Sequence, residues 1–202
     1  MKRFFLDRAI SLIRKNNENI SDIEIEKIRY GLEGIYLTIT KFMILAAITF
    51  YIGIFKEFMI FTVLYNFIRV FAFGMHASKS FICLISSAAL FISLPLLALT
   101  INIHIILKMV LCFVSLMMII LYAPADTIKR PLLRMKKRLK LKVFSLAVTI
   151  IYIGITLISK DIFISNAVLL ALIMEVILIL PVTYKIFGMP YRNYKSYRHK
   201  SN

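Results

Sequence analysis

The sequence predicts an all-α integral membrane protein of about six transmembrane helices preceded by N-terminal amphipathic helices. Hydrophobic residues make up 60% of its 202 residues, which is too many for a soluble domain whose surface must meet water. Apolar stretches of about the length that crosses a hydrocarbon core of ~30 Å recur along the chain. The formal net charge of +16 comes from basic residues that flank these stretches, so it indicates a negatively charged membrane surface and argues against nucleic acid as a partner.

The N-terminal segment, residues 1–34, holds more than half of the ten acidic residues of the chain. Ser21 and Glu24 match a capping box, a pattern that begins helices. Two runs of apolar residues recur at helical spacing, one formed by Leu6, Ile10 and Ile13 and the other by Ile25, Ile28, Leu32 and Ile35. We therefore expect two amphipathic helices in the inner membrane interface, and a solvated helical arm awaiting a partner is the alternative.

Six apolar stretches follow, and each is expected to cross the membrane, although the second is short. They cover residues 35–55, 58–73, 81–100, 103–122, 143–159 and 162–181. We assign residues 35–185 to one membrane domain and residues 186–202 to a basic cytoplasmic tail. The chain has two cysteines, which excludes a disulfide framework and a four-cysteine zinc site, so we expect no metal and no other cofactor.

The distribution of basic residues orients these stretches. The turns after the first, third and fifth stretches carry little more than Lys56, Asn102 and Lys160, and such a low number of basic residues is expected at the outer face. The connection after the fourth stretch and the C-terminal tail are strongly basic, with Lys129, Arg130, Arg134, Lys136, Lys137, Arg138, Lys140 and Lys142 in the first and Lys185, Arg192, Lys195, Arg198 and Lys200 in the second. The positive-inside rule then predicts a multi-pass cell-membrane protein with both termini in the cytoplasm.

His76 and Cys83 stand seven residues apart at the junction of the second and third stretches, on the predicted cytoplasmic side. A thiol beside an imidazole is the minimal equipment for nucleophilic acyl chemistry, because histidine takes the proton and leaves a reactive thiolate. On one continuous helix seven residues rise ~10.5 Å, beyond hydrogen-bond reach. A catalytic pair therefore requires a break between the two residues.

Gly74 and the polar run Ser78-Lys79-Ser80 supply such a break, with His76 ending one helix and Cys83 beginning the next. If Ser80 caps the second helix, Cys83 lies in its first turn, where the helix dipole favours a thiolate. Lys79 adds positive charge to the same turn. The alternative is that Cys83 is a small buried hydrophobe and His76 an interfacial polar residue.

His104 and Cys112 form a rival pair, eight residues apart in one apolar stretch near the outer face. No glycine or polar break separates them, so we assign this pair to packing.

Two further charges fall inside the apolar stretches. Arg69 is a functional candidate because an intramembrane arginine costs several kcal/mol unless it finds a partner, and snorkelling to the inner headgroups is the alternative. Glu175, deep in the last stretch, is expected to be structural and to pair with Lys108 or Lys41.

Several segments together carry a resemblance to a known family. They are Tyr30-Gly31-Leu32, Arg69, Gly74-Met75-His76-Ala77, Cys83, Tyr122-Ala123-Pro124-Ala125-Asp126-Thr127 and Arg130-Pro131. This combination resembles the accessory gene regulator protein B family, the membrane-embedded cysteine endopeptidases of Gram-positive quorum sensing. Phe73 departs from the pattern, because the family commonly has a second glycine there, and the turn is expected to be stiffer in this chain.

The resemblance implies a short propeptide substrate with an acidic C-terminal recognition tail, and a homodimeric enzyme in the lipid bilayer. His76 would deprotonate Cys83, whose thiolate would form an acyl-thioester that an internal cysteine or serine converts to a thiolactone or lactone. Arg69, Gly74, Ser78 and Lys79 would support this pair. Basic residues would attract the acidic tail, and the candidates are Lys129, Arg130, Arg134, Lys136 and Lys137.

A competing class is a non-enzymatic membrane transporter or peptide-export partner. Such a protein would use Arg69, Lys108 and Glu175 as intramembrane polar sites and leave Cys83 inert.

Overall fold

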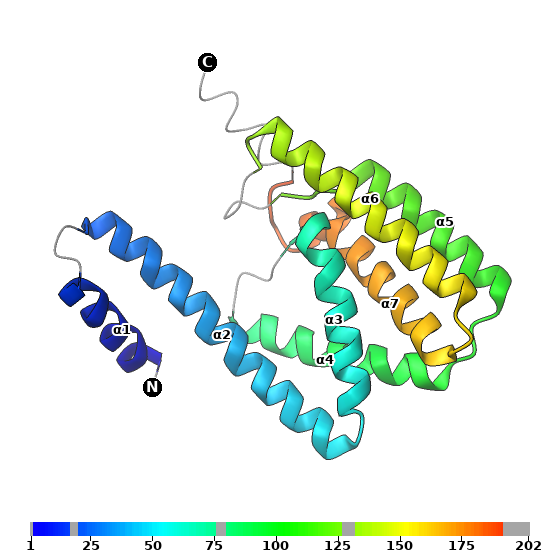
Figure 1. The fold of residues 1–202 in the computed structure, drawn as a ribbon, viewed down its shortest axis with the longest axis horizontal. Helices are drawn as coiled ribbons and strands as arrows, with labels where there is room; N and C mark the ends of the chain where they lie inside the picture. The colour runs from blue at the N-terminus through cyan, green and yellow to red at the C-terminus, as the bar shows by residue number, and fades with distance from the viewer. Residues whose placement is uncertain (1, 17–19, 76–79, 127–131, 192–202) are drawn as a thin grey trace. The chain divides into compact units, whose positions relative to one another are not determined.

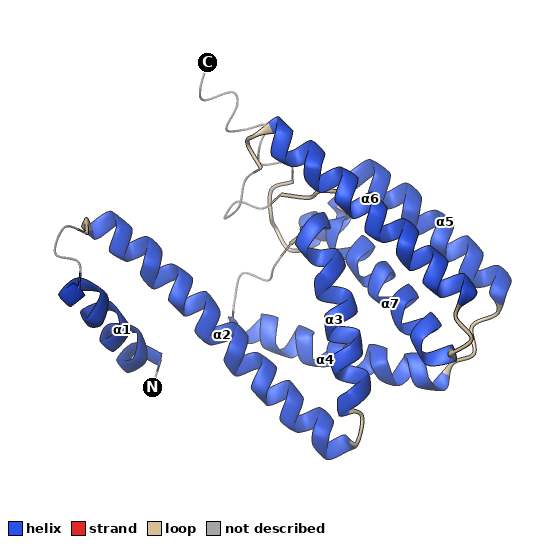
Figure 2. Cartoon of the chain, in the orientation of Figure 1, coloured by secondary structure: helices blue, strands red, loops and turns tan. Residues whose placement is uncertain are grey.

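A computed structural model of the chain describes residues 2–16, 20–75, 80–126 and 132–191, with the backbone alone for residues 2, 3, 16 and 80–84. Most of the described residues are in helices joined by short loops (Figure 2). One isolated bridge joins Phe73 to Ala125. The chain divides into two compact units, Met1–Tyr51 and Ile52–Asn202.

The first unit contains α1 (Lys2–Asn16) and the long helix α2 (Asp22–Ile52), both blue to cyan in Figure 1. The predicted capping box is confirmed: the Ser21 N–H donates to the Glu24 carboxylate at 3.1 Å, and the Glu24 N–H donates to the Ser21 hydroxyl at 3.4 Å. Ion pairs of Arg14 with Asp22 (2.7 Å) and of Arg29 with Asp7 (2.6 Å) join α1 to α2.

The second amphipathic helix was expected to end before the first apolar stretch, but the two form one continuous helix. The expected boundary at residues 34 and 35 lies inside α2, which runs on for 31 residues. The reason is local: residues 22–52 contain no proline and no polar break, and a change from amphipathic to fully apolar sequence leaves the helical backbone intact.

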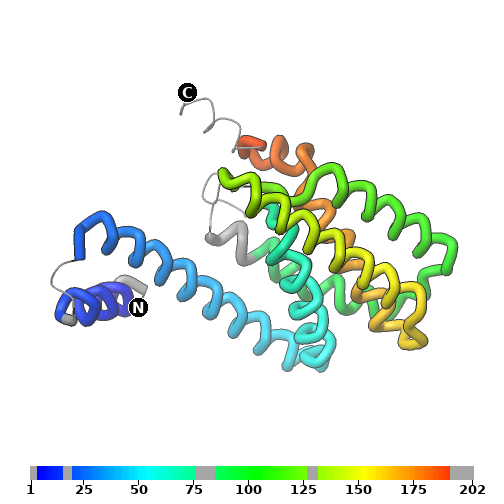
Figure 3. Tube along the Cα trace, turned by 45° about the horizontal axis from the view of Figure 1, so that its top comes forward, coloured from blue at the N-terminus to red at the C-terminus, as the bar shows by residue number. Residues whose placement is uncertain are grey.

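The second unit is a helical bundle built around α7 (Ile162–Ile179), which packs against α3 (Phe55–Ala72), α4 (Ser80–Thr100), α5 (Ile105–Tyr122) and α6 (Met135–Ile158). The short helix α8 (Pro181–Ile186) follows α7 directly. Figures 1 and 3 show α7, in orange, between its neighbours. Since α7 is apolar on all sides and mostly buried, it forms the centre of the bundle.

Four described helices are long and apolar enough to cross a membrane: α2, α5, α6 and α7. The helix α3 has 18 residues but carries Lys56, Glu57 and Arg69. Helix α4 has 21 residues, and its side chains are described from Ile85 onward, an apolar segment that ends at Thr100. This confirms the prediction of a helical membrane protein. The expected second and third stretches correspond to α3 and α4.

The basic connection after the fourth stretch is helical in part. Helix α6 begins at Met135, so Lys136, Lys137 and Lys142 belong to its first turns rather than to a loop. Arg134 and Lys136 are exposed, whereas Lys129 and Arg130 lie outside the described residues. Basic side chains at a helix start are disfavoured by the helix dipole, so their position is better explained by the membrane surface.

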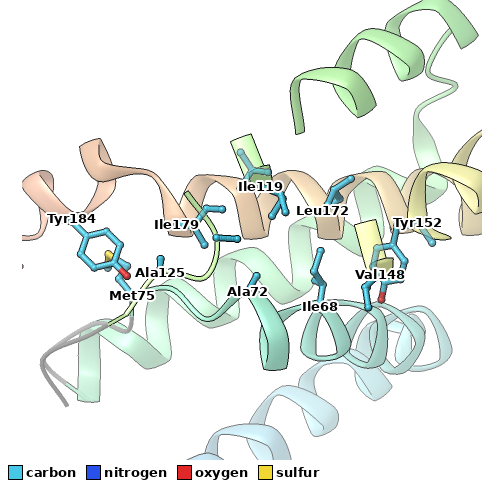
Figure 4. Packing of buried hydrophobic residues seen from close by; sticks show 13 residues of the cluster. Ile68, Ala72, Met75, Ile119, Ala125, Val148, Tyr152, Leu172, Ile179 and Tyr184 are labelled. Atoms are coloured by element: carbon cyan, nitrogen blue, oxygen red, sulfur yellow. The ribbon is translucent and has the colours of Figure 1, made fainter. Parts of the chain in front are cut away.

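A hydrophobic cluster joins α3, α5, α6, α7 and α8 (Figure 4). Ile68 of α3, Ile119 of α5 and Leu172 of α7 are fully or almost fully buried in it. The Tyr152 hydroxyl of α6 donates to the Leu64 carbonyl of α3 at 2.6 Å. This packing holds the C-terminal end of α3, which carries the segment leading to His76.

The alternation of helices predicts the side from which each connection is reached. In a chain with Cys83→Ser and Cys112→Ala, so that a single thiol reacts, Arg138→Cys should be labelled by a membrane-impermeant maleimide from the cytoplasmic face only. Asn102→Cys should be labelled from outside only, because its connection lacks basic residues. Labelling of both sites from the opposite faces would invert the topology and place His76 outside.

Candidate functional site

The predicted helix break between the second and third stretches is present. Helix α3 ends at Ala72 and helix α4 begins at Ser80, which places Cys83 in the first turn of α4. Helix α3 was expected to continue to His76 but ends at Ala72, and Ser80, which was expected to cap the next helix, lies within α4. His76, Ser78 and Lys79, and the side chain of Cys83, lie outside what the structure describes.

The segment Phe73–Met75, which leads directly into His76, is held by its backbone. The Gly74 N–H donates to the Ala125 carbonyl at 2.9 Å, and the Ala125 N–H donates to the Ala72 carbonyl at 3.0 Å. On the other side, the Met75 N–H donates to the carbonyl of Leu178 in α7 at 3.2 Å. The segment is therefore fixed between residues 123–126 and the C-terminal end of α7.

The Arg69 side chain donates hydrogen bonds to the carbonyls of Phe73 and Met75, which the backbone contacts above do not involve. Its Nη1 donates to the Phe73 carbonyl at 2.5 Å and its Nη2 donates to the Met75 carbonyl, so the guanidinium spans Gly74. The same Nη1 lies 3.3 Å from the Glu175 carboxylate. The Arg69 side chain is 10% exposed and that of Glu175 is 0% exposed, so this is a buried ion pair.

This pair corrects two sequence-based expectations. Arg69 does not snorkel to the headgroups, and Glu175 pairs with Arg69 rather than with Lys108 or Lys41. Lys108 instead donates to the Ser165 hydroxyl at 2.6 Å. Depth argues against Lys108, which lies near the outer end of the fourth stretch, but it does not separate Lys41 from Arg69, since both lie toward the predicted cytoplasmic ends of their stretches. Opposite charges at one depth satisfy each other at the lowest cost.

The backbone conformation explains why glycine occupies position 74. Gly74 has φ 113°, and a Cβ built there would collide with the Arg69 guanidinium and lie 3.0 Å from the Leu178 carbonyl oxygen. Phe73 also has positive φ, at 62°, where a side chain is disfavoured. A glycine, which the resemblance leads us to expect here, would adopt this conformation with less strain than Phe73, and the stiffer turn stays a prediction.

Residues 123–126 form the other wall of this segment, and sequence reasoning assigned them no role beyond the resemblance. The Tyr184 hydroxyl of α8 donates to the Asp126 carbonyl at 3.1 Å. Burial raises the pKa of the Tyr184 hydroxyl above its usual range, so it remains a proton donor at neutral pH. Helix α8 thus anchors the strand-like stretch that pairs with residues 72–74.

Similarity to known proteins shows the family of the chain. The sequence model of the Accessory gene regulator B family matches residues 6–179, which is most of the chain. The chain belongs to this family. An AgrB-like protein of Clostridium acetobutylicum is 32% identical over 189 residues, covering 94% of this chain and 90% of the relative. The Accessory gene regulator protein B of Staphylococcus aureus strain MW2 is 33% identical over 179 residues, covering 89% and 94% respectively. No solved structure matches the chain.

The rival pair of this Accessory gene regulator B family member has separate structural tasks. The His104 Nδ1 caps helix α5 by accepting from the Ile106 N–H at 3.4 Å. Cys112 is buried inside the same helix. The predicted packing role agrees with the buried position of Cys112, whereas His104 is exposed and caps the helix instead. Among the described residues, no group of His, Cys, Asp or Glu is arranged to hold a metal ion.

The tight contact at Gly74 predicts a sharp difference between two glycines. Gly74→Ala should lower the free energy of unfolding by about 1–3 kcal/mol, because the methyl group meets Arg69 and the backbone is strained. Thermal unfolding in detergent measures this. Gly154→Ala in α6 is the matched control, since nothing lies within 4 Å of its added Cβ. Equal stability of the two variants would contradict the described contact.

Proposed function

We propose that this protein is a membrane-embedded cysteine endopeptidase that removes the C-terminal tail of a quorum-sensing propeptide and promotes its cyclisation. Membership of the Accessory gene regulator B family supports a role in that regulatory system. The single observation that carries the catalytic assignment is the helix break. It leaves the chain before His76 tied down at Phe73–Met75 and begins a new helix three residues before Cys83.

In the proposed reaction His76 takes the proton from the Cys83 thiol. The thiolate attacks the carbonyl carbon of the peptide bond before the tail, that C–N bond breaks, and the imidazolium protonates the leaving amine. The product is an acyl-thioester on Cys83. His76, neutral again, then takes the proton of an internal cysteine or serine of the propeptide as that side chain attacks the thioester. The bond between the acyl carbon and the Cys83 sulfur breaks, which closes the thiolactone or lactone ring and releases the Cys83 thiolate.

Cyclisation competes with hydrolysis at the second step. Exchange of one thioester for another is nearly isoenergetic, so the outcome depends on the exclusion of water around the acyl group. A site at the end of apolar helices and near the cytoplasmic membrane surface suits that requirement, and the first turn of α4 adds a helix dipole that favours the Cys83 thiolate.

The acidic tail of the propeptide is proposed to meet the basic residues before and within the start of α6. Arg134, Lys136 and Lys137 are exposed there, and Lys129 and Arg130 precede them in the sequence. Exposed charges of this kind guide encounter and orientation more than they add affinity. Both chain termini are proposed to lie in the cytoplasm, and the enzyme is proposed to act as a homodimer in the bilayer.

The competing class, a non-enzymatic transporter or export partner, needs intramembrane polar groups that are available to a cargo. Arg69 and Glu175 instead bind each other and the backbone, and Lys108 binds Ser165, which in turn donates to the Thr156 carbonyl at 2.6 Å. These contacts favour the peptidase, and no contact in the described part of the chain favours transport over it.

The assignment of the nucleophile predicts a difference between the two cysteines. Cys83→Ala should abolish propeptide cleavage in liposomes, measured by mass spectrometry, while substrate binding persists, because the nucleophile alone is lost. Cys112→Ala should cleave at the normal rate, since Cys112 is buried within α5. Cleavage by the Cys83 variant, or its loss in the Cys112 variant alone, would identify a different nucleophile.

The proposed thiol–imidazole pair predicts a distinct pH profile for Cys83. In His76→Gln the thiol should behave as a free cysteine, with a pKa of ~8.5, because the stabilising imidazolium is gone. Alkylation of Cys83 at neutral pH should therefore slow and should recover as the pH rises. His104→Gln is the control, since His104 caps α5, and its profile should match the unmodified protein. An unaltered profile in His76→Gln would remove the imidazole from the mechanism.

A further inference from the structure

The Arg69 guanidinium divides its hydrogen bonds unequally between its partners. The contact to the Phe73 carbonyl is 2.5 Å, whereas the two contacts to the Glu175 carboxylate are 3.3 and 3.4 Å. A pair that served only to neutralise two buried charges would direct the planar fork at the carboxylate in a bidentate manner. Here the fork spans two backbone carbonyls, and the carboxylate holds it from one side.

The carbonyls of Phe73 and Met75 depend on Arg69 as a hydrogen-bond donor. A backbone oxygen buried in an apolar bundle is destabilising without a donor, and Arg69 donates to the carbonyls of both Phe73 and Met75. Glu175 in turn compensates a guanidinium that would otherwise be a buried, unpaired charge. Without the carboxylate, Arg69 would gain more by turning toward the headgroups than by remaining in the bundle.

We propose that Glu175 is a positioning residue, which acts through Arg69 to fix residues 73–75 and thereby the direction in which the chain enters His76. This inference rests on the proposed function, since the position of His76 matters only if it pairs with Cys83. Helix α7 supports the same segment a second time, because the Leu178 carbonyl, three residues after Glu175, accepts from the Met75 N–H at 3.2 Å.

The first test compares Glu175→Gln with the unmodified protein in liposomes, both with Cys112→Ala so that alkylation reports on Cys83. The pH profile of alkylation should shift toward that of His76→Gln, and propeptide cleavage should fall about 100-fold, as a misplacement of roughly 1 Å can cause. The double variant His76→Gln with Glu175→Gln should alkylate no more slowly than His76→Gln alone, because the two act through one pair. Lys108→Met, which removes a buried charge elsewhere in the bundle, should leave the profile unchanged.

A second test separates positioning from a contribution to folding alone. The exchanged pair Arg69→Glu with Glu175→Arg keeps both charges buried but moves the fork to α7, away from the two carbonyls. Where it folds, it should keep the altered alkylation profile of Glu175→Gln, because restoring the charge pair does not return the fork to the two carbonyls. Arg69→Lys keeps the charge but lacks the planar fork, so it should show the same altered alkylation profile. This variant replaces Glu175→Gln in the test if Glu175→Gln does not insert into the membrane.

A folded Glu175→Gln or Arg69→Lys protein with the unmodified alkylation profile overturns the inference, as does a folded exchanged pair that regains that profile. If the profile of the unmodified protein already equals that of His76→Gln, the proposed pair itself is wrong and the positioning role fails with it. The two failures are distinguishable, because the first leaves the effect of His76→Gln intact.

Discussion

An arginine buried in an apolar bundle is the constraint on which the rest of the second unit depends. Arg69 sits in the last turn of α3 with 10% of its side chain exposed, and such a charge persists in hydrocarbon only with partners on every side. Glu175 supplies the opposite charge, and the carbonyls of residues 73 and 75 supply the acceptors. Non-helical backbone can exist at this depth because a side chain satisfies it, which is the condition that membrane interiors impose.

The central helix α7 provides hydrogen-bonding groups to non-helical backbone near both of its ends. Near its start, the Asn166 amide donates to the carbonyls of Ala98 and Ile101, which lie where α4 ends and have no helical partner. Ser165 beside it joins the Lys108 ammonium to the Thr156 carbonyl. Near its end, Glu175 and the Leu178 carbonyl hold the segment after α3. A helix that is otherwise apolar all round therefore places its few polar groups where neighbouring helices stop.

This arrangement gives the proposed chemistry a rigid frame on one side. The segment before His76 is bounded by α3, by residues 123–126 and by α7, and residues 123–126 are bounded in turn by Tyr184 of α8. Cys83 enters from a separate helix that begins at Ser80. The proposed pair would thus be assembled from two separate elements, one of which has a fixed backbone.

Hydropathy and local pattern in the sequence were enough to establish the helical membrane class, the approximate positions of its helices, the capping box at Ser21 and Glu24, and the break between the second and third stretches. Each of these depends on residues a few positions apart, and the family resemblance adds several such short segments together. The sequence did not reveal that α2 is continuous through residue 35, that α3 ends at Ala72, or that Glu175 pairs with Arg69, 106 residues away in the chain. Only the tertiary structure decided these, because the partner of a buried charge depends on which helix ends meet at one depth, and hydropathy records depth for each helix without recording its neighbours.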